Sequence, residues 1–315
     1  MKQPDGKRLY IQDVAVRDGF QIEPKFIPTE QKIALINRLS RTGLAKIEVT
    51  SFVSPKAIPA LADAEAVMRG IDRIDGVLYA ALVPNVRGCE RALDCSVDEI
   101  NLVMSASDSH GRANLRMTPE QSLVSFADVV KVVQGGARTK PAAINVSLST
   151  AFGCPFDGAV APERVLEIVD RCQQLGIGGV TLCDTTGMAN PAQVARLFEA
   201  VLARFPRMQV TAHFHNTRGM GLANALVALD VGIDRFDASL GGLGGCPFAP
   251  GATGNVCTED LVHMFETMGY ATGVNLDSLL EIARALPSIV EHEVPGQVMK
   301  AGAADRRYPL PASIA

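Results

Sequence analysis

Short apolar runs alternate along the chain with longer segments in which apolar residues recur every three to four positions. The short runs are rich in β-branched residues and predict eight strands, at residues 9–16, 46–52, 77–83, 98–105, 142–148, 179–184, 209–215 and 235–241. The segments between them predict helices. Thr118 and Asn190, each followed by proline, are expected N-caps, and Thr29 and Gly43 are the expected N-cap and stop of the first helix.

Eight strand–helix units in about 250 residues predict a closed (β/α)8 TIM barrel with a C-terminal helical extension. We expect residues 1–257 to form the catalytic barrel and residues 258–315 to form a helical cap and tail of the same structural unit. An open doubly wound sheet is the alternative. That fold normally carries a glycine-rich fingerprint after the first strand, where this sequence reads VRDGFQIE.

Composition narrows the possible partners. Apolar residues make up 47% of the 315 residues, charged residues make up 20%, and the formal net charge is −4 with no long run of one sign, so we expect no nucleic-acid partner. The seven cysteines form no CxxC pair, which is typical of reduced thiols in the cytoplasm. No apolar stretch reaches the roughly 18 residues of a membrane span, so we expect no membrane partner.

Two of the five histidines, His213 and His215, stand in the predicted strand TAHFH. Residues two apart on a strand point to the same face, so the two imidazoles are expected side by side. Such a pair is either the start of a metal site or two histidines hydrogen-bonded in a polar pocket.

In a barrel, the active site lies at the carboxyl ends of the strands, where further polar residues follow the predicted strands. Asp18 follows the first strand, and an amide oxygen of Asn255 completes a mixed nitrogen and oxygen ligand set with the two histidines. This set suits Mg²⁺ or Mn²⁺ better than structural zinc.

Arg17, beside this set, is expected either to stabilise an anionic oxygen that develops during reaction or to form an ion pair with Glu48 or Asp184. Cys246 lies in a loop with six glycines between Gly241 and Gly254, where a reactive thiol is expected more than a structural one.

The segments RDGFQIE, IEVTSFVSPKAIP, FGCPFDG, HFH and GGLGGCPFAPGATGNVCTEDLVHMFETMGYATGVNL resemble the 3-hydroxy-3-methylglutaryl-CoA (HMG-CoA) lyases, a branch of the metal-dependent barrel lyases and Claisen synthases. The resemblance extends over residues 9–300, and the GGLGGCP…GATGN loop is its most specific motif.

The resemblance implies a function for each matching residue. The metal ligands are Asp18, His213, His215 and Asn255. Arg17 steadies an enolate, Cys246 takes part in proton transfer, and Glu48, Asp184 and Glu259 belong to the site and its support. The expected substrate contacts are Gln21, Ser51, Asn114, Asn145 and Ser147, the partner is an acyl-CoA, and the expected assembly is a homodimer.

The sequence departs from the family pattern mainly at substrate contacts. The Arg and Tyr expected on the fifth strand are absent from AINVSL, one expected Asn is Arg116, and Asn216 follows the second histidine, as in the synthase branch.

We therefore expect metal-dependent cleavage of a 3-hydroxyacyl-CoA, with Asp184 or His213 as the base. The substrate is either HMG-CoA itself or a citramalyl- or isohexenylglutaryl-type thioester. A Claisen synthase and a non-catalytic binding barrel are the alternatives.

Overall fold

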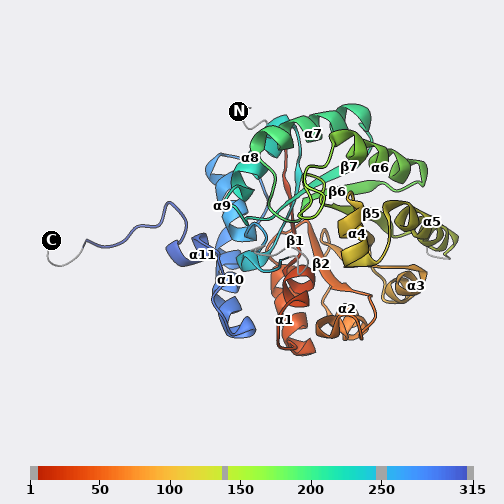
Figure 1. The fold of residues 1–315 in the computed structure, drawn as a ribbon. Helices are drawn as coiled ribbons and strands as arrows, with labels where there is room; N and C mark the ends of the chain where they lie inside the picture. Colours follow the sequence, from red (N-terminus) through yellow and green to blue (C-terminus); the bar gives the residue numbers. More distant parts are fainter. Residues whose placement is uncertain (1–5, 137–140, 246–253, 311–315) are drawn as a thin grey trace.

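The computed structural model describes residues 6–136, 141–245 and 254–310 and confirms the predicted (β/α)8 barrel (Figure 1). Eight parallel strands pair in chain order, and β8 returns to β1 with Asp13 opposite Ala238, which closes the sheet. The strands are β1 (Tyr10–Asp13), β2 (Lys46–Ser51), β3 (Leu78–Leu82), β4 (Glu99–Ser105), β5 (Ala143–Ser149), β6 (Gly179–Asp184), β7 (Gln209–Phe214) and β8 (Arg235–Ala238).

Helices surround the barrel (Figure 1). In chain order they are α1 (Thr29–Leu39), α2 (Ala64–Gly70), α3 (Val86–Asp94), α4 (Asp108–Leu115), α5 (Pro119–Gly135), α6 (Pro162–Gln174), α7 (Pro191–Arg204), α8 (Gly221–Val231), α9 (Thr258–Thr267), α10 (Leu276–Val290) and α11 (Val298–Ala301). Within the described ranges, no helix is both long enough and apolar enough to cross a bilayer.

Two of the three predicted helix starts are confirmed. Thr118 and Asn190 each accept a hydrogen bond from the backbone N–H three residues on, and Gln121 and Gln193 complete the capping boxes of α5 and α7. The prediction for Thr29 was wrong. Thr29 is the first residue of α1, and its hydroxyl donates to Asp63 Oδ2 at 2.8 Å instead of capping its own helix.

The first strand is shorter than predicted. It ends at Asp13, and residues 15–19 form a π-helical turn, η1 (Ala15–Gly19). The backbone N–H of Ala15 donates to Asp13 Oδ1, and those of Arg17 and Asp18 donate to the carbonyl of Val14. These local bonds replace the sheet ladder and form the turn that carries Arg17 and Asp18. The last strand is also shorter than predicted and stops at Ala238.

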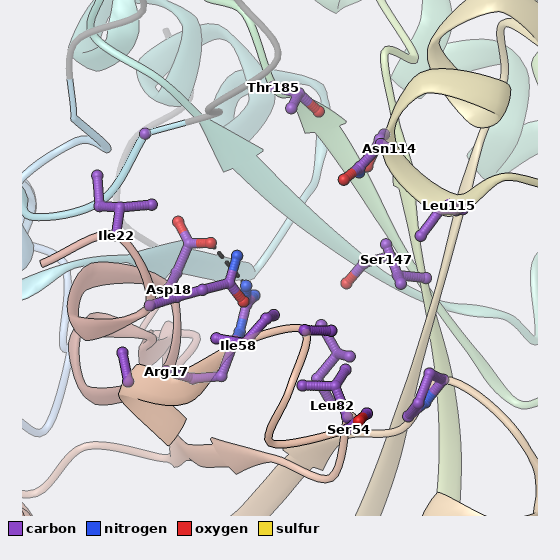
Figure 2. A pocket seen from close by; sticks show the side chains of 18 of the residues that line it. Arg17, Asp18, Ile22, Ser54, Ile58, Leu82, Asn114, Leu115, Ser147 and Thr185 are labelled. Atoms are coloured by element: carbon purple, nitrogen blue, oxygen red, sulfur yellow. Dashed lines mark hydrogen bonds and ion pairs between the residues drawn. The ribbon is translucent and has the colours of Figure 1, made fainter. Parts of the chain in front are cut away.

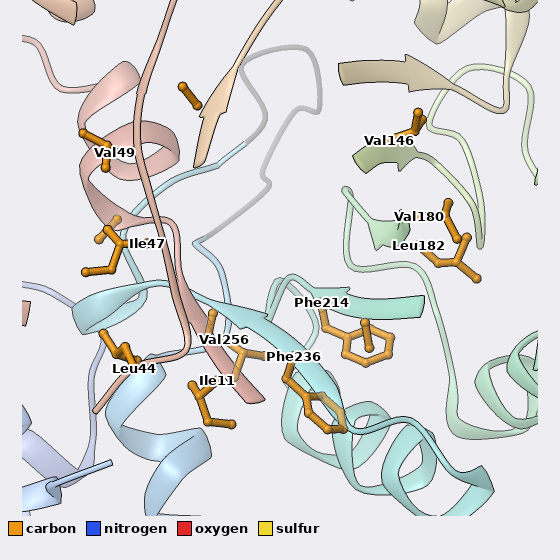
Figure 3. Packing of buried hydrophobic residues seen from close by; sticks show 14 of the residues in the cluster. Ile11, Leu44, Ile47, Val49, Val146, Val180, Leu182, Phe214, Phe236 and Val256 are labelled. Atoms are coloured by element: carbon orange, nitrogen blue, oxygen red, sulfur yellow. The ribbon is translucent and has the colours of Figure 1, made fainter. Parts of the chain in front are cut away.

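Strand residues alternate between the barrel interior and the helices. Apolar side chains such as Val49, Val146 and Leu182 point outward and are fully buried against the helices (Figure 3). Their neighbours along the strands, such as Glu48 and Ser147, point inward. The main core therefore lies between sheet and helices, while the centre of the barrel is polar and available for a site.

Helix α4 was not predicted. Ser107 caps it by accepting a hydrogen bond from His110 N, and Arg116 ends it in a left-handed conformation (φ 57°). The helix is short and carries only two buried residues, so its apolar periodicity is weak. It carries Asn114 and Leu115 to the mouth of the barrel.

The packing between barrel and cap gives a stability prediction. Phe236 on β8 and Phe265 on α9 are fully buried, with ring centroids 4.9 Å apart. We expect Phe236→Ala to lower the free energy of unfolding by about 3–5 kcal/mol, because it removes a buried ring and leaves a cavity. Urea denaturation measures this. Val124→Ala, at a side chain that is 67% exposed, is the control and should change it by less than about 0.5 kcal/mol. A loss below about 1 kcal/mol for Phe236→Ala would contradict the described packing.

Candidate active site

A cavity of about 1350 Å³ opens at the carboxyl ends of the strands. Figure 2 shows Arg17 and Asp18 on one wall, with Ser147, Asn114 and Leu115 across the cavity. The strand-end residues thus meet at one mouth, as a parallel barrel requires.

Arg17 is held by two carboxylates. Its Nε donates to Glu48 Oε2 at 2.5 Å and its Nη1 donates to Asp18 Oδ1 at 2.6 Å. Burial alone would lower the pKa of this guanidinium, but Glu48 and Asp18 outweigh it and raise the pKa. Within the described chain, Arg17 Nη2 donates to no residue. Arg17 therefore forms ion pairs through Nε and Nη1 and still has Nη2 available to donate to a ligand.

Asp18 lies beside the Arg17 guanidinium, the two histidines and the amide of Asn255. Burial opposes its ionisation, yet Arg17, His215 and His213 together lower its pKa, so it is a carboxylate at neutral pH. Its Oδ2 accepts a hydrogen bond from Asn255 Nδ2 at 2.8 Å. The same nitrogen donates to the carbonyl of Leu243, while Asn255 Oδ1 is buried and has no hydrogen-bond partner in the described chain.

His213 and His215 lie side by side, as predicted, with ring centroids 5.2 Å apart, and both line the cavity. A backbone bridge between His215 and Asn255 brings the segment after residue 253 against the end of β7. Asp237 on β8 is opposite His213 in register, and its Oδ2 lies 3.7 Å from His213 Nδ1.

Asp184 supports the backbone beside the site. Its Oδ1 accepts hydrogen bonds from the N–H groups of Met188 and Ala189, at 2.8 and 3.1 Å. Burial raises its pKa to about 6. It is not among the residues that line the cavity, whereas its neighbours Cys183 and Thr185 are.

Glu259, at the start of α9, supports the turn that follows β8. Its Oε2 accepts a hydrogen bond from Gly241 N at 3.0 Å, and Asp13 accepts one from Leu240 N at 2.8 Å. Gly241 has φ 64°, a conformation that favours glycine. These two buried carboxyl groups therefore fix the backbone that leads toward the predicted loop.

The structure separates the predicted substrate contacts into two groups. Gln21, Asn114 and Ser147 line the cavity. Ser51 and Asn145 are buried and do not line it, and Glu48 lies behind Arg17. Cys246 lies outside the described residues.

Sequence reasoning missed Asp237 and Cys183, which line the cavity, and Asn101, which lies beneath it in the barrel interior. All three occupy inward positions of strands. Asp237 lies two residues from the inward Arg235, and Asn101 lies two residues from Glu99 in EINLV. Polar residues spaced by two on otherwise apolar strands were the signal that could have found Asp237 and Asn101.

The donor types fit a divalent metal: one ionised carboxylate, two imidazoles and an amide oxygen that is buried without a partner. In the arrangement described, Asp18 makes hydrogen bonds through both carboxylate oxygens. Over the described ranges, no three His, Cys, Asp or Glu side chains are clustered closely enough to hold an ion.

The fold is a closed (β/α)8 barrel, and the cavity at the carboxyl ends of its strands holds an arginine bound by two carboxylates and a pair of histidines. This is the architecture of a barrel enzyme whose active site lies at the carboxyl ends of the strands. A family model described as HMGL-like matches residues 8–286. The chain belongs to this HMGL-like family, and it is a carbon–carbon lyase of the oxo-acid type.

Relatives with assigned activities cover almost the whole chain. The chain is 48% identical over 294 residues to hydroxymethylglutaryl-CoA lyase YngG of Bacillus subtilis, covering 93% of this chain and 97% of that one. It is 42% identical to (R)-citramalyl-CoA lyase of Chloroflexus aurantiacus, covering 93% and 94%. Among solved structures, an HMG-CoA lyase from Acinetobacter baumannii in complex with coenzyme A and 3-methylmalate is 49% identical with a TM-score of 0.93, covering 98% and 100%.

Burial of Glu259 predicts a pH-dependent stability. Burial raises its pKa to about 8 from an ordinary 4.5. Between these values the folded chain retains a proton that the unfolded chain has released. The free energy of unfolding should therefore fall as pH rises through this window, by about 1 kcal/mol per pH unit. Stability that Glu259 contributes is fully present below pH 4.5 and lost by pH 8.

Urea denaturation from pH 5 to pH 8 measures this slope. Glu259→Gln should flatten it, whereas Glu281→Gln, at an exposed position of α10, should leave it unchanged. An equal slope in the parent and Glu259→Gln would show that Glu259 does not bind the extra proton.

Proposed function

We propose that the chain cleaves a branched 3-hydroxyacyl-CoA between C2 and C3, releasing acetyl-CoA and an oxo product. The observation that carries this proposal is the placement of Arg17, clamped by Glu48 and Asp18, in one cavity with His213 and His215. The names of the relatives support an acyl-CoA substrate, since they include two acyl-CoA lyases and a coenzyme A complex.

Asp18, His213, His215 and Asn255 would hold the divalent metal, Mg²⁺ or Mn²⁺. When bound, the metal polarises the substrate hydroxyl and lowers its pKa. Asn255 Oδ1 supports this assignment, because a buried amide oxygen without a donor is otherwise unfavourable.

Arg17 has the donor that the enolate requires. Bond cleavage moves negative charge onto the thioester oxygen, and the unpaired Nη2 of Arg17 would stabilise it as it develops. Glu48 and Asp18 restrict the guanidinium through Nε and Nη1, so little reorganisation is needed during the reaction.

For the hydroxyl proton, His213 is a better acceptor than Asp184. His213 lines the cavity, and Asp237 lies 3.7 Å from its Nδ1, where a carboxylate stabilises an imidazolium. Asp184 does not line the cavity and accepts two backbone hydrogen bonds. A neutral imidazole that binds a metal through one nitrogen carries a hydrogen on the other, so His213 cannot be ligand and proton acceptor at the same moment, and the base role requires that His213 is not bound to the metal when it takes the proton.

Protonation of the enolate carbon completes the reaction, and we assign it to Cys246 on the family resemblance alone. A homodimer belongs to the same proposal and rests on the same resemblance, whereas a cytoplasmic location is proposed from the cysteine usage of the sequence.

The acyl end of the cavity favours a substrate other than HMG-CoA. The Tyr expected on the fifth strand is absent, and Ser147 of β5 lines the cavity together with Leu82, Val103 and Leu115. A small hydroxyl among apolar walls leaves room for a different acyl group. The (R)-citramalyl-CoA lyase relative supports the same alternative.

Metal removal is the first test. We expect EDTA to abolish turnover and Mg²⁺ or Mn²⁺ to restore it, because in the proposed reaction the metal lowers the pKa of the substrate hydroxyl. Asp18→Asn should weaken Mn²⁺ binding by at least about tenfold, measured by calorimetry, because it removes a charged ligand. Full activity of the metal-free chain would overturn the ligand assignment.

A substrate panel tests the acyl preference. We expect kcat/KM for HMG-CoA to be about ten- to a hundredfold below that for citramalyl-CoA or a longer branched thioester, because family contacts on β5 are absent. Coupled detection of acetyl-CoA measures all thioesters alike. A value for HMG-CoA far above the others would contradict the preference, and no cleavage of any thioester with metal present would refute the proposed function.

A further inference from the structure

Asn101 on β4 connects the floor of the cavity with the catalytic arginine. Its side chain lies in the barrel interior and is only 7% exposed. Its Oδ1 accepts hydrogen bonds from Asn145 Nδ2 at 2.9 Å and Ser147 Oγ at 3.0 Å. Its Nδ2 donates to Glu48 Oε1 at 2.6 Å.

The two donors on Oδ1 fix the orientation of the Asn101 amide. A flipped amide would turn its NH₂ group toward the NH₂ group of Asn145 and its oxygen toward the carboxylate of Glu48. Both contacts are unfavourable in a buried site. The Nδ2 group is therefore directed at Glu48.

Glu48 links the oriented Asn101 amide to Arg17, because its carboxylate accepts a hydrogen bond from each of them. The carboxylate is 3% exposed and uses one oxygen for each neighbour, Oε1 for Asn101 Nδ2 and Oε2 for Arg17 Nε. With Oε1 engaged, rotation of the carboxylate is restricted, and Oε2 stays on the side of the guanidinium.

We propose that Asn101 is a positioning residue for the lyase reaction, acting through Glu48 to hold Arg17 in the orientation that meets the thioester oxygen. It does not line the cavity, so its effect should appear in the rate of the chemical step and not in substrate binding. The inference rests on the proposed role of Arg17.

Two substitutions break the hydrogen bond from Asn101 to Glu48 in different ways. Asn101→Leu keeps a similar volume but leaves Glu48 Oε1 buried without a donor. Asn101→Asp keeps the shape but sets two carboxylates against each other. We expect each to lower kcat by about ten- to a hundredfold, with KM within about threefold and Mn²⁺ affinity within about threefold.

A double variant provides the sharper measurement. In Glu48→Gln/Asn101→Asp, the new amide can donate to the new carboxylate and still accept from Arg17 Nε. We expect Glu48→Gln alone to lower kcat, because its amide cannot accept from both donors. The double variant should recover kcat to within about tenfold of the parent and exceed both single variants.

Thr181→Val is the matched control. Thr181 is buried in the same polar layer and accepts from Asn145 Nδ2 at 3.0 Å, but its side chain is hydrogen-bonded to neither Asn101 nor Glu48. Its kcat should stay within about threefold of the parent. Circular dichroism melts show whether each variant is folded at the assay temperature.

The outcomes separate this inference from the proposed function. If Arg17→Gln retains activity, the role proposed for Arg17 fails. If Arg17→Gln loses activity but folded Asn101→Asp keeps kcat within threefold, only the role of Asn101 is overturned. A double variant no better than the single variants also overturns it, as does a loss for Thr181→Val equal to that for Asn101→Leu.

Discussion

Closure of the parallel sheet into a barrel is the constraint on which the rest of the structure depends. It assigns every strand residue to one of two environments, the apolar layer under the helices or the barrel interior. The interior holds Lys46, Glu48, Glu99 and Asp237, all largely removed from water. Because an unpaired charge is costly there, each inward charge needs a neighbour of opposite sign or a hydrogen-bond donor.

Three ion pairs, centred on two cations, meet this requirement at different depths. Lys46 pairs with Glu99 at 2.8 Å deep in the barrel, and Arg17 pairs with Glu48 and Asp18 at the mouth. The deeper pair has both partners on strands. Arg17 instead comes from the π-helical turn after β1, so its position depends on the groups that hold its side chain. This difference explains why the arginine at the mouth can be both charged and available to a ligand.

The sequence predicted the barrel and much of its mouth because strand periodicity and strand order fix which residues converge. His213 and His215 met as expected for residues two apart. The end of β1 was not predictable in this way, because backbone bonds to Asp13 and Val14 override the apolar run that continues to Val16. Helix α4 and the pairing of Asp237 with His213 also depend on contacts between segments distant in sequence, which periodicity does not encode.

The fifth strand shows why a departure from a family pattern has two consequences. The Arg and Tyr that the family resemblance leads one to expect are absent from this strand, and the obvious effect is on the acyl group, since Ser147 lines the cavity. The side chains of Asn145 and Ser147 also donate to Asn101 Oδ1, which places them in the chain of hydrogen bonds that ends at Arg17. A change in substrate contacts on β5 therefore cannot be independent of the arginine. Asn145 and Ser147 contact Asn101, and Asn101 contacts Glu48, so three neutral side chains connect the acyl end of the cavity with the carboxylate that binds Arg17.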